Sequence, residues 1–495
     1  MTDKSRLAIF RTDAGSTIGW GHVMRCSALA NCLRAAGWRC VWVTASRESA
    51  IRARLSTRFD EVVGLAPRQD EPEAMRNRWR GGCHLLVIDH YERDACFGAA
   101  CRGWADRILV IDDLPERAHD CDLLLDTAPG HNEQDYRRRV PEGTQLLLGP
   151  DYALLMPEYA ATRRRAIPRS YKGAAKQVLV ALGATNPGDL LDKILDAIEQ
   201  ASVALSPDLV LSWNMPDIER LSARAEHAGG RVHVDVKNMA ELMVGADLAI
   251  GAGGNSAWER CTLGLPTLLL VIAENQQINA KALDRVGAVR VVAPEIDSLV
   301  GAIDSLAGDP YELKNMSAAA ARLADGLGAI RVSQAVVAQP EARDGQVVRL
   351  RPVRMTDADT LLAWQRQPET RRFARNPQIP ERSEHVRWMA DKLDDPDCLM
   401  NIILHGEVPA GVARLDRMSE GYEVSIAIDP GRFRLGLGRI ALTLLHDLVS
   451  ESDLWAHVHA ENLASQALFR SSGYCDTELS GWLVHRGCGE GGWCP

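Results

Sequence analysis

The sequence alternates short, wholly apolar runs with amphipathic stretches of helical length, and this alternation constrains the fold more than any other feature. In the first 150 residues the apolar runs lie at 7–10, 40–45, 85–89, 108–113, 123–126 and 146–149. Strands that are apolar on both faces are typical of a parallel sheet covered by helices on both sides. The sequence therefore predicts an open, mostly parallel α/β sheet over 1–150.

The same pattern starts again after a transition at 151–170 that is rich in Arg and Pro. A helix is expected at 189–201, between the first two of the new runs. These apolar runs lie at 177–183, 209–213, 232–236, 248–253, 267–272 and 289–292. We therefore predict a second α/β domain over 151–337, and two such domains in series favour a ligand cleft between them.

A third unit is predicted after the polar segment 338–346, which contains Pro and Gly and is expected to be a linker. This unit covers 347–486 and opens with a strand, a loop and a helix. The Gly-rich residues 487–495 are expected to form a loose tail. The predicted fold class is thus α/β throughout, with three successive domains.

Composition restricts the function classes. The 495 residues include 57 Lys and Arg and 66 Asp and Glu, a net charge of −9, which argues against broad nucleic-acid binding. The 12 Cys contain no C-x-x-C pair, which favours reduced thiols in the cytoplasm and no metal site. No signal peptide and no apolar stretch of about 18 residues is evident, so we expect no membrane partner. The oligomeric state stays open.

A Gly-rich turn that ends in a histidine follows the first strand. Asp13 precedes the turn, and Gly19 and Gly21 lie in it. His22 is at the tip of the turn, and Arg25 lies in the first turn of the helix expected at 23–36. A side chain at the carboxyl end of such a strand faces the edge where open α/β sheets bind ligands. Histidine titrates near neutral pH and can act there as a general base, although a capping or exposed histidine would give the same pattern.

Two further Gly-rich turns each join a strand to a helix in the second domain. Thr185 lies in the first, and Asn255 and Ser256 lie in the second, where small polar side chains at a helix start suit a diphosphate. Glu259, one turn into its helix, can accept hydrogen bonds from two ribose hydroxyls. One such turn is an ordinary connection, but two in one domain favour nucleotide binding.

Together these features resemble nucleotide-sugar glycosyltransferases with two facing Rossmann-like domains, the GT-B architecture. Over about residues 5–335 the resemblance is closer to a hydrolase family of pseudaminic acid synthesis that acts on UDP-2,4-diacetamido-2,4,6-trideoxy-β-L-altropyranose. The matching motifs are Gly19-x-Gly21-His22-x-x-Arg25-Cys26, Asp89-His90-Tyr91, Ile111-Asp112-Asp113, Gly149-x-x-Tyr152-Ala153-Leu154-Leu155, Gly253-Gly254-Asn255-Ser256 with Glu259, and Glu274-Asn275-Gln276.

The resemblance implies that water attacks the anomeric carbon of the sugar and that UDP leaves. His22 would be the general base or would orient the water, and Asp13 is the expected carboxylate that fixes its tautomer, unless it binds the sugar. Asp112 and Asp113 are candidates for a glycosidase-like carboxylate pair, or simply residues of a strand-end loop. The implied substrate-binding residues are Gly21, Arg25, Tyr91, Thr185, Asn255, Ser256, Glu259 and Asn275.

In the third unit, a strand at 422–428 is followed by a segment that resembles the pyrophosphate loop of the Gcn5-related N-acetyltransferases (GNAT), (Q/R)-x-x-G-x-(G/A). Phe433 occupies the first position of that motif, so the basic residue, Arg434, is displaced by one. Successive N–H groups at a helix start suit the pyrophosphate of coenzyme A. The resemblance, over about 347–486, implies acetyl-CoA as donor. The residues that it implies for binding are Arg434, Gly436, Gly438, Arg439, Asn462 and Ser465.

The acid and base of the acetyl transfer are less well specified by the sequence. Phe469 occupies the position where the family often has a Tyr that protonates the leaving thiolate. Tyr474, water or another group would then act, or the step needs no acid. Glu423 and Ser425 could deprotonate the amine, or could simply face solvent on an alternating strand.

The two resemblances imply consecutive reactions, N-acetylation of a UDP-4-amino-sugar followed by hydrolytic release of UDP. The sequence thus predicts a bifunctional enzyme of pseudaminic acid synthesis. Three alternatives remain: a UDP-sugar glycosyltransferase with an appended acyltransferase, the equivalent enzyme of legionaminic acid synthesis, and a nucleotide-sugar sensor with degenerate sites.

Overall fold

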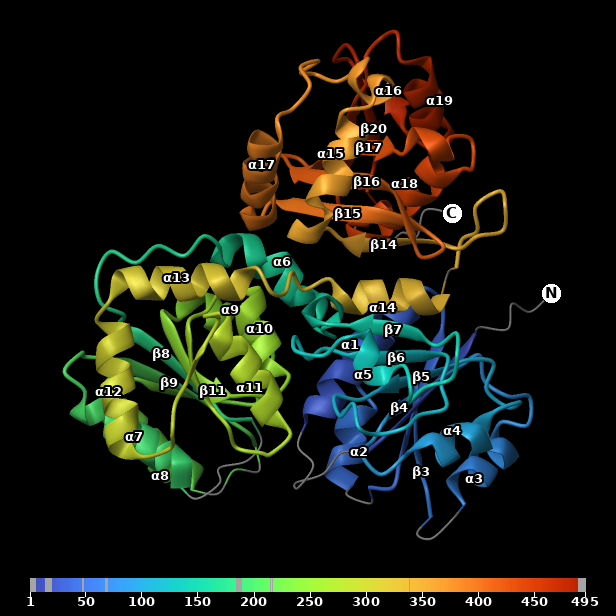
Figure 1. Ribbon diagram of the computed structural model, residues 1–495. Helices are drawn as coiled ribbons and strands as arrows, with labels where there is room; N and C mark the ends of the chain where they lie inside the picture. Colours follow the sequence, from blue (N-terminus) through green and yellow to red (C-terminus); the bar gives the residue numbers. More distant parts are fainter. Residues whose placement is uncertain are drawn as a thin grey trace. The chain divides into compact units, whose positions relative to one another are not determined.

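The computed structural model describes residues 6–13, 20–46, 49–66, 70–183, 189–213, 215, 217–337 and 339–487. The chain forms two compact units (Figure 1), and the boundary between Ser333 and Gln334 falls inside helix α14 (Gly328–Val337). The first unit contains two parallel sheets and the second a mixed sheet. The fold class expected from the sequence is confirmed.

The first sheet has seven parallel strands in the order β3-β2-β1-β4-β5-β6-β7. The strand order reverses between β1 and β4, and ligands bind beside such a switch point at the carboxyl ends of the strands. Its strands are β1 (Leu7–Thr12), β2 (Arg39–Thr44), β3 (Glu61–Gly64), β4 (Leu85–Asp89), β5 (Ile108–Ile111), β6 (Leu123–Asp126) and β7 (Gln145–Leu148). Its helices are α1 (Gly21–Ala35), α2 (Ser49–Leu55), α3 (Glu71–Arg78), α4 (Ala95–Cys101) and α5 (Glu133–Tyr136), followed by the 3-10 turn Pro150–Tyr152.

The second sheet has six parallel strands in the order β10-β9-β8-β11-β12-β13, with its own switch point between β8 and β11. The two Gly-rich turns follow these two strands. The strands are β8 (Gln177–Ala181), β9 (Ser206–Leu211), β10 (Arg231–Val234), β11 (Leu248–Ala252), β12 (Thr267–Leu270) and β13 (Arg290–Val291). The helices are α6 (Pro157–Ala166), α7 (Leu190–Gln200), α8 (Ile218–His227), α9 (Met239–Gly245), α10 (Ser256–Thr262), α11 (Gln276–Arg285), α12 (Ile296–Ala307), α13 (Pro310–Ala321) and α14.

Arginines of the transition at 151–170 hold the ends of helices in the second domain. Arg163 donates hydrogen bonds to the carbonyl oxygens of Thr262, Ala321 and Ala324. Arg169 does the same at the ends of α9 and α10. Carbonyls at a helix end have no partner within the helix and carry partial negative charge, so a cation there is stabilising. The Arg-rich transition is therefore part of the packed domain.

The second unit has a seven-stranded sheet in the order β14-β15-β16-β17-β18-β20-β19. Strands β17 and β18 run parallel but pair only at Tyr422 with Leu454 and at Glu423 with Trp455, so they separate beyond that point. The strands are β14 (Val348–Pro352), β15 (Cys398–His405), β16 (Val408–Arg417), β17 (Tyr422–Ile428), β18 (Leu454–His457), β19 (Cys475–Asp476) and β20 (Trp482–His485). The helices are α15 (Ala358–Gln365), α16 (Pro368–Arg371), α17 (Arg382–Asp394), α18 (Leu437–Leu448) and α19 (Leu463–Ser471), with 3-10 turns at Met355–Asp357 and Pro430–Arg432.

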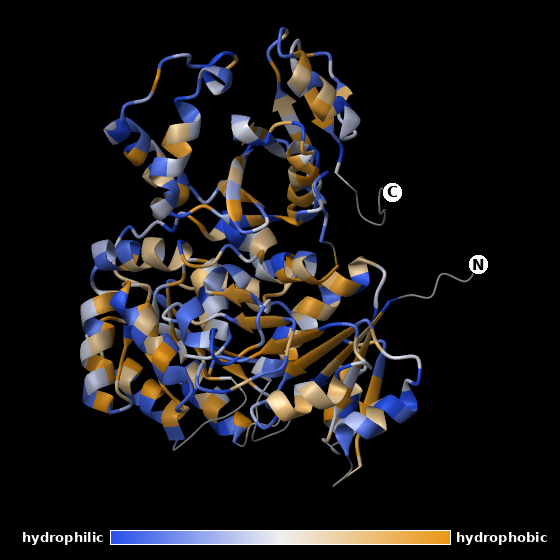
Figure 2. Cartoon of the chain, turned by 45° about the vertical axis from the view of Figure 1, so that its right-hand side comes forward, coloured by the Kyte–Doolittle hydropathy of each residue, from blue (hydrophilic) through white to orange (hydrophobic). Residues whose placement is uncertain are grey.

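The hydropathy of the elements follows their position in each unit. Figure 2 shows strongly hydrophobic strands in the sheets and helices that are hydrophobic on part of their surface and hydrophilic elsewhere. Strands β4, β5 and β6 are buried along their whole length, as their uniformly apolar sequences require. No helix in the described part of the chain has both the length and the apolar character needed to cross a membrane.

Candidate active sites

His22 stands at the start of α1 and is held by a carboxylate at the end of β4. Its Nδ1 atom lies 2.6 Å from Oδ1 of Asp89, and 13% of the His22 side chain is exposed. A carboxylate only accepts hydrogen bonds, so Asp89 selects the tautomer in which Nδ1 carries the proton. Nε2 then carries the lone pair and can take a proton from a bound water.

Arg25 and the thiol of Cys26 complete the surroundings of Asp89. Nε of Arg25 donates to Oδ2 of Asp89 at 2.7 Å, and the Cys26 Sγ atom lies 3.4 Å from the same oxygen. Burial by itself would raise the pKa of Asp89, but the charges of Arg25 and His22 outweigh burial and hold that pKa well below its ordinary value. Asp89 is therefore a permanent anion beside His22.

The expectation that Asp13 orients His22 is wrong in this structure. Asp13 instead accepts hydrogen bonds from Arg11 at 2.9 and 3.2 Å and lies 2.9 Å from Nε2 of His90. Arg11 is fully buried, and a buried guanidinium requires carboxylate partners, so it draws Asp13 away from His22. Asp89 takes the expected place because β4 is the neighbour of β1 across the switch point.

Tyr91 and Asn275, both expected to contact substrate, meet each other across the two Rossmann-like domains. The Asn275 side-chain amide donates to the Tyr91 hydroxyl at 2.8 Å, and this hydroxyl donates to Oδ1 of Asp113 at 3.2 Å. The Tyr91 ring lies edge-on to His22, with 5.4 Å between ring centroids. Burial and the nearby Asp113 raise the pKa of Tyr91 to about 12, so it is a neutral hydrogen-bond donor at physiological pH.

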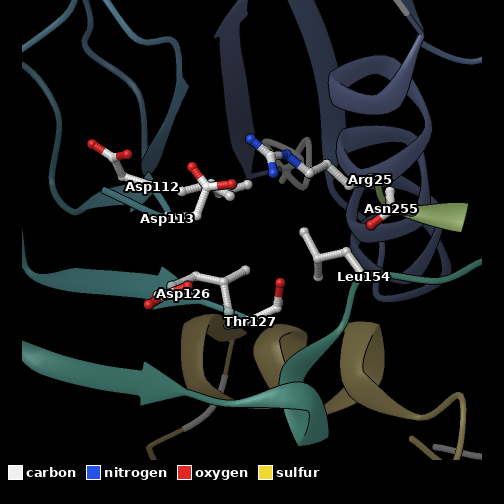
Figure 3. A pocket seen from close by; sticks show the side chains of 9 residues that line it. Arg25, Asp112, Asp113, Asp126, Thr127, Leu154 and Asn255 are labelled. Atoms are coloured by element: carbon white, nitrogen blue, oxygen red, sulfur yellow. The ribbon is translucent and has the colours of Figure 1, made fainter. Parts of the chain in front are cut away.

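A pocket beside this group joins residues of both domains (Figure 3). Arg25, Asp113 and Asn255 point toward the same space, with Asn255 contributed by the second domain. Further lining residues are Ile111, Asp112, Leu125, Asp126, Thr127 and Leu154. The pocket therefore lies where a ligand would contact both domains at once.

The two candidate carboxylates after β5 have different surroundings. Asp112 is buried and bonded to Nε2 of His119 at 2.6 Å and to Arg117. Asp113 accepts from Tyr91, and burial, together with the charges of Asp112 and Asp126, raises its pKa against the opposing effect of Arg25. Asp112 is thus paired with His119 and Arg117 inside the protein. Asp113 is the carboxylate that a ligand in the pocket can contact. Neither was given a definite role by the sequence.

The residues expected to bind the nucleotide lie at the start of α10 and in the first Gly-rich turn of the second domain. Ser256 begins α10 and accepts a hydrogen bond from Arg260 at 3.1 Å, while the carbonyl of Ala252 accepts from the same guanidinium at 2.7 Å. Glu259 is 9% exposed, and burial raises its pKa although Tyr159 hydrogen-bonds to it. Thr185 lies outside the described residues. Gly21 is the first residue of α1, with open space where a side chain would stand.

In the second unit, the segment that resembles the pyrophosphate loop joins β17 to α18. Arg434 and Gly436 have positive φ angles of 67° and 86°, and Gly436 immediately precedes α18. A side chain at Gly438 would meet Leu468 of α19 at 3.0 Å, so this glycine also permits helix packing. Arg439 is exposed in the first turn of α18. The loop has the alternating backbone that turns successive N–H groups toward one side.

Asn462 and Ser465 lie together at the start of α19, where the Asn462 side chain accepts from the Ser465 backbone N–H at 3.1 Å. This contact is a helix cap.

Phe469 is buried and packs against Tyr474, with ring centroids 4.9 Å apart. Tyr474 is also buried, which raises the pKa of its hydroxyl, and that hydroxyl has no hydrogen-bond partner within the described residues. Tyr474 is thus placed as a core residue.

Glu423 is positioned where β17 and β18 separate, and it forms an ion pair with Arg375. Ser425, two residues farther along β17, is exposed. A carboxylate at the point of separation can receive a proton from an amine that enters the gap between the strands, directly or through water.

Comparison with known families finds one matching domain in each unit. Residues 348–474 match the model of the acetyltransferase (GNAT) domain, and residues 231–329 match the C-terminal domain of glycosyltransferase family 28. The chain therefore has two Rossmann-like domains, the second of which matches a glycosyltransferase C-terminal domain over 231–329, and a C-terminal unit that matches the GNAT acetyltransferase domain.

Three proteins are similar over more than half of the chain. An uncharacterized protein of Methanocaldococcus jannaschii is 24% identical over 276 residues, which cover 54% of this chain but only 56% of that protein. The spore coat polysaccharide biosynthesis protein SpsG of Bacillus subtilis is 28% identical over 56% of this chain and 80% of its own length. The UDP-2,4-diacetamido-2,4,6-trideoxy-beta-L-altropyranose hydrolase of Campylobacter jejuni is 23% identical over 56% of this chain and 96% of its own length. The chain is thus a homologue of a sugar-nucleotide hydrolase.

Proposed function

We propose that the chain is a bifunctional sugar-nucleotide enzyme of pseudaminic acid synthesis. In this proposal the GNAT domain transfers an acetyl group from acetyl-CoA to the 4-amine of a UDP-amino-sugar. The two Rossmann-like domains then hydrolyse UDP-2,4-diacetamido-2,4,6-trideoxy-β-L-altropyranose to the free sugar and UDP. The observation that carries the hydrolase assignment is the His22–Asp89 pair beside a pocket lined by both domains. The name of the Campylobacter relative supplies the substrate.

The His22–Asp89 pair suits activation of water. Nε2 of His22 takes a proton from the water as its oxygen forms a bond to C1 of the sugar, and Asp89 stabilises the imidazolium that results. The C1–O bond breaks, and its electron pair leaves with UDP. Asn255 and the start of α10 would contact the diphosphate, and Glu259 the ribose. Developing charge on UDP is met by backbone N–H groups, so this route requires no metal.

For the acetyl transfer, we propose Glu423 as the proton acceptor. The amine nitrogen forms a bond to the acetyl carbon, and the carbon–sulfur bond then breaks to release the coenzyme A thiolate. Phe469 has no proton to donate and Tyr474 is buried, so water is the source of the thiolate proton in this proposal.

UDP-sugars and acetyl-CoA are cytoplasmic metabolites, which supports a cytoplasmic location.

Release of UDP in the absence of any acceptor tests the hydrolase assignment. The full chain, given the diacetamido UDP-sugar and water alone, should release UDP stoichiometrically with free sugar. His22→Ala should still bind UDP but lose roughly 10²–10⁴-fold in kcat, the usual contribution of a general base. UDP release that requires an acceptor would instead identify a glycosyltransferase, and binding without turnover would identify a sensor.

The legionaminic acid alternative differs from this proposal only in the stereochemistry of the sugar. Parallel assays with the corresponding diacetamido UDP-sugar of that route decide between the two. A kcat/KM at least tenfold higher for the altro-configured substrate supports the pseudaminic acid assignment, and the reverse ranking overturns it.

A further inference from the structure

The segment expected to be a linker forms a short hairpin, residues 340–347, that belongs to the second unit. The backbone N–H of Val348 donates to the Pro340 carbonyl, and that of Ala342 donates to the Gln346 carbonyl, both at 2.8 Å. The Glu341–Val347 bridge closes the same antiparallel pair. The 340–347 hairpin is thus an ordered part of the domain that follows it.

A chain of side-chain contacts fixes this hairpin beside the start of the pyrophosphate loop. Nε2 of His405 lies 2.9 Å from Oδ1 of Asp344, and Nδ1 of His405 lies 2.6 Å from Nη1 of Arg432. The guanidinium can only donate, so Nδ1 of His405 accepts and Nε2 donates to Asp344. His405 is the last residue of β15, and Arg432 is the last residue of the 3-10 turn before the loop. His405 therefore links Asp344 of the hairpin to Arg432.

Arg343, at the turn of the hairpin, contacts the loop itself. Its backbone N–H donates to the Leu435 carbonyl at 3.0 Å, and its Nη1 donates to the Arg434 carbonyl at 3.1 Å. Its Cγ lies 4.0 Å from the place that a side chain on Gly436 would occupy. One residue of the connecting segment therefore holds two consecutive carbonyl groups of the loop.

The orientation of these carbonyls determines the orientation of the anion-binding N–H groups. In a trans peptide the C=O and N–H bonds point in opposite directions. With the carbonyls of Arg434 and Leu435 held on the Arg343 side, the N–H groups of Leu435 and Gly436 point to the other side. Neither N–H has an acceptor in the described part of the chain, and the positive φ angles of Arg434 and Gly436 are those of an anion-binding concavity.

We infer that Arg343 is a positioning residue for the pyrophosphate of acetyl-CoA, so that the segment joining the two units forms part of the donor site. The inference rests on the proposed acetyltransferase function. Arg343 acts through the loop backbone, because its contacts are to carbonyl oxygens. Its influence is therefore confined to donors that carry a pyrophosphate.

The test compares two donors on the full chain, acetyl-CoA and S-acetylpantetheine, which lacks the pyrophosphate. Arg343→Ala should raise the KM for acetyl-CoA about three- to tenfold, the effect of one lost hydrogen bond, with kcat nearly unchanged. The kcat/KM for S-acetylpantetheine should stay within twofold of the wild-type value. Arg343→Lys, which keeps a cationic donor, should recover part of the loss.

Arg349→Ala is the matched control, since Arg349 is an arginine of the same unit that pairs with Glu407 on the surface. It should leave both donors unchanged. Equal losses for acetyl-CoA and S-acetylpantetheine in Arg343→Ala would show a merely structural role and overturn the inference. Unchanged KM for acetyl-CoA would also overturn it. Failure of the wild-type chain to use acetyl-CoA would instead refute the proposed acetyltransferase function.

Discussion

At the scale of single residues, two carboxylates stand at the carboxyl ends of neighbouring strands, and only one contacts His22. Asp89 binds Nδ1 of His22, while Asp13 is held by Arg11 and His90. Both residues belong to motifs recognised in the sequence. Which of the two carboxylates contacts His22 depends on the pairing of β1 with β4 and on the burial of Arg11 beside Asp13. The spacing of residues along the sequence indicates neither of these. This is why the sequence indicated His22 as the candidate base but predicted the wrong carboxylate partner for it.

Asp89→Asn tests whether Asp89, and not Asp13, is the carboxylate that supports His22 as a base. An amide at this position can donate to Nδ1 and select the tautomer in which Nε2 carries the proton, so the base is lost. We expect kcat for UDP release to fall roughly 10²–10⁴-fold with little change in KM. Steady-state kinetics of UDP release measure this.

Asp13→Asn is the matched comparison, because it removes the same charge at the end of the adjacent strand. Its kcat should remain within about tenfold of wild type, and its main effect should be on thermal stability through Arg11. Equal losses of kcat in the two variants would contradict the assignment of Asp89 as the partner of His22.

At the scale of secondary-structure elements, apolar runs were sufficient to place most of the parallel strands. The strand β3 was missed because Glu61–Gly64 is a short, half-exposed edge strand that lacks a wholly apolar run. The expected linker contains a folded hairpin, because Arg343 bonds to the loop before α18 and Asp344 bonds to His405 at the end of β15. Turn composition indicates where the chain changes direction but not what packs against the turn.

An ion network joins β1 to α3, and its pH dependence is predictable. Arg11 and Arg93 both bond to Glu71, with distances of 2.7 Å from Arg11. Burial raises the pKa of Glu71, but the two arginines outweigh burial and lower the pKa to about 2 from an ordinary value of 4.5. A carboxyl whose folded-state pKa is lowered stabilises the fold above its unfolded pKa, and this contribution is lost as pH falls toward 2.

Glu71→Gln should therefore reduce the free energy of unfolding at pH 7 by up to about 3 kcal/mol, and by progressively less below pH 4.5. Denaturant unfolding of the wild type and the variant between pH 7 and pH 3 measures the difference. A difference that is constant over this range would show that the charge of Glu71 is not what stabilises the network.

At the scale of the whole molecule, the chain divides into its two units inside α14 and not within the polar segment that was expected to be a linker. A chain that ends after Val337 keeps α14 complete. It should remain folded and release UDP from the diacetamido UDP-sugar with kcat within about twofold of the full chain, because the residues assigned to hydrolysis all precede α14. Circular dichroism and UDP release assays measure both expectations, and loss of folding would show that the second unit belongs to the same cooperative core.

The order of the two reactions is the central claim, and mass spectrometry of one substrate tests it most directly. The full chain is incubated with the UDP-linked 2-acetamido-4-amino-2,4,6-trideoxy sugar, with and without acetyl-CoA. We predict that the mass rises by one acetyl group and that free UDP and diacetamido sugar follow only when acetyl-CoA is present. Release of UDP from the unacetylated substrate at the same rate, or absence of acetylation while the pre-acetylated substrate is cleaved, would contradict the claim that this chain performs both steps in that order.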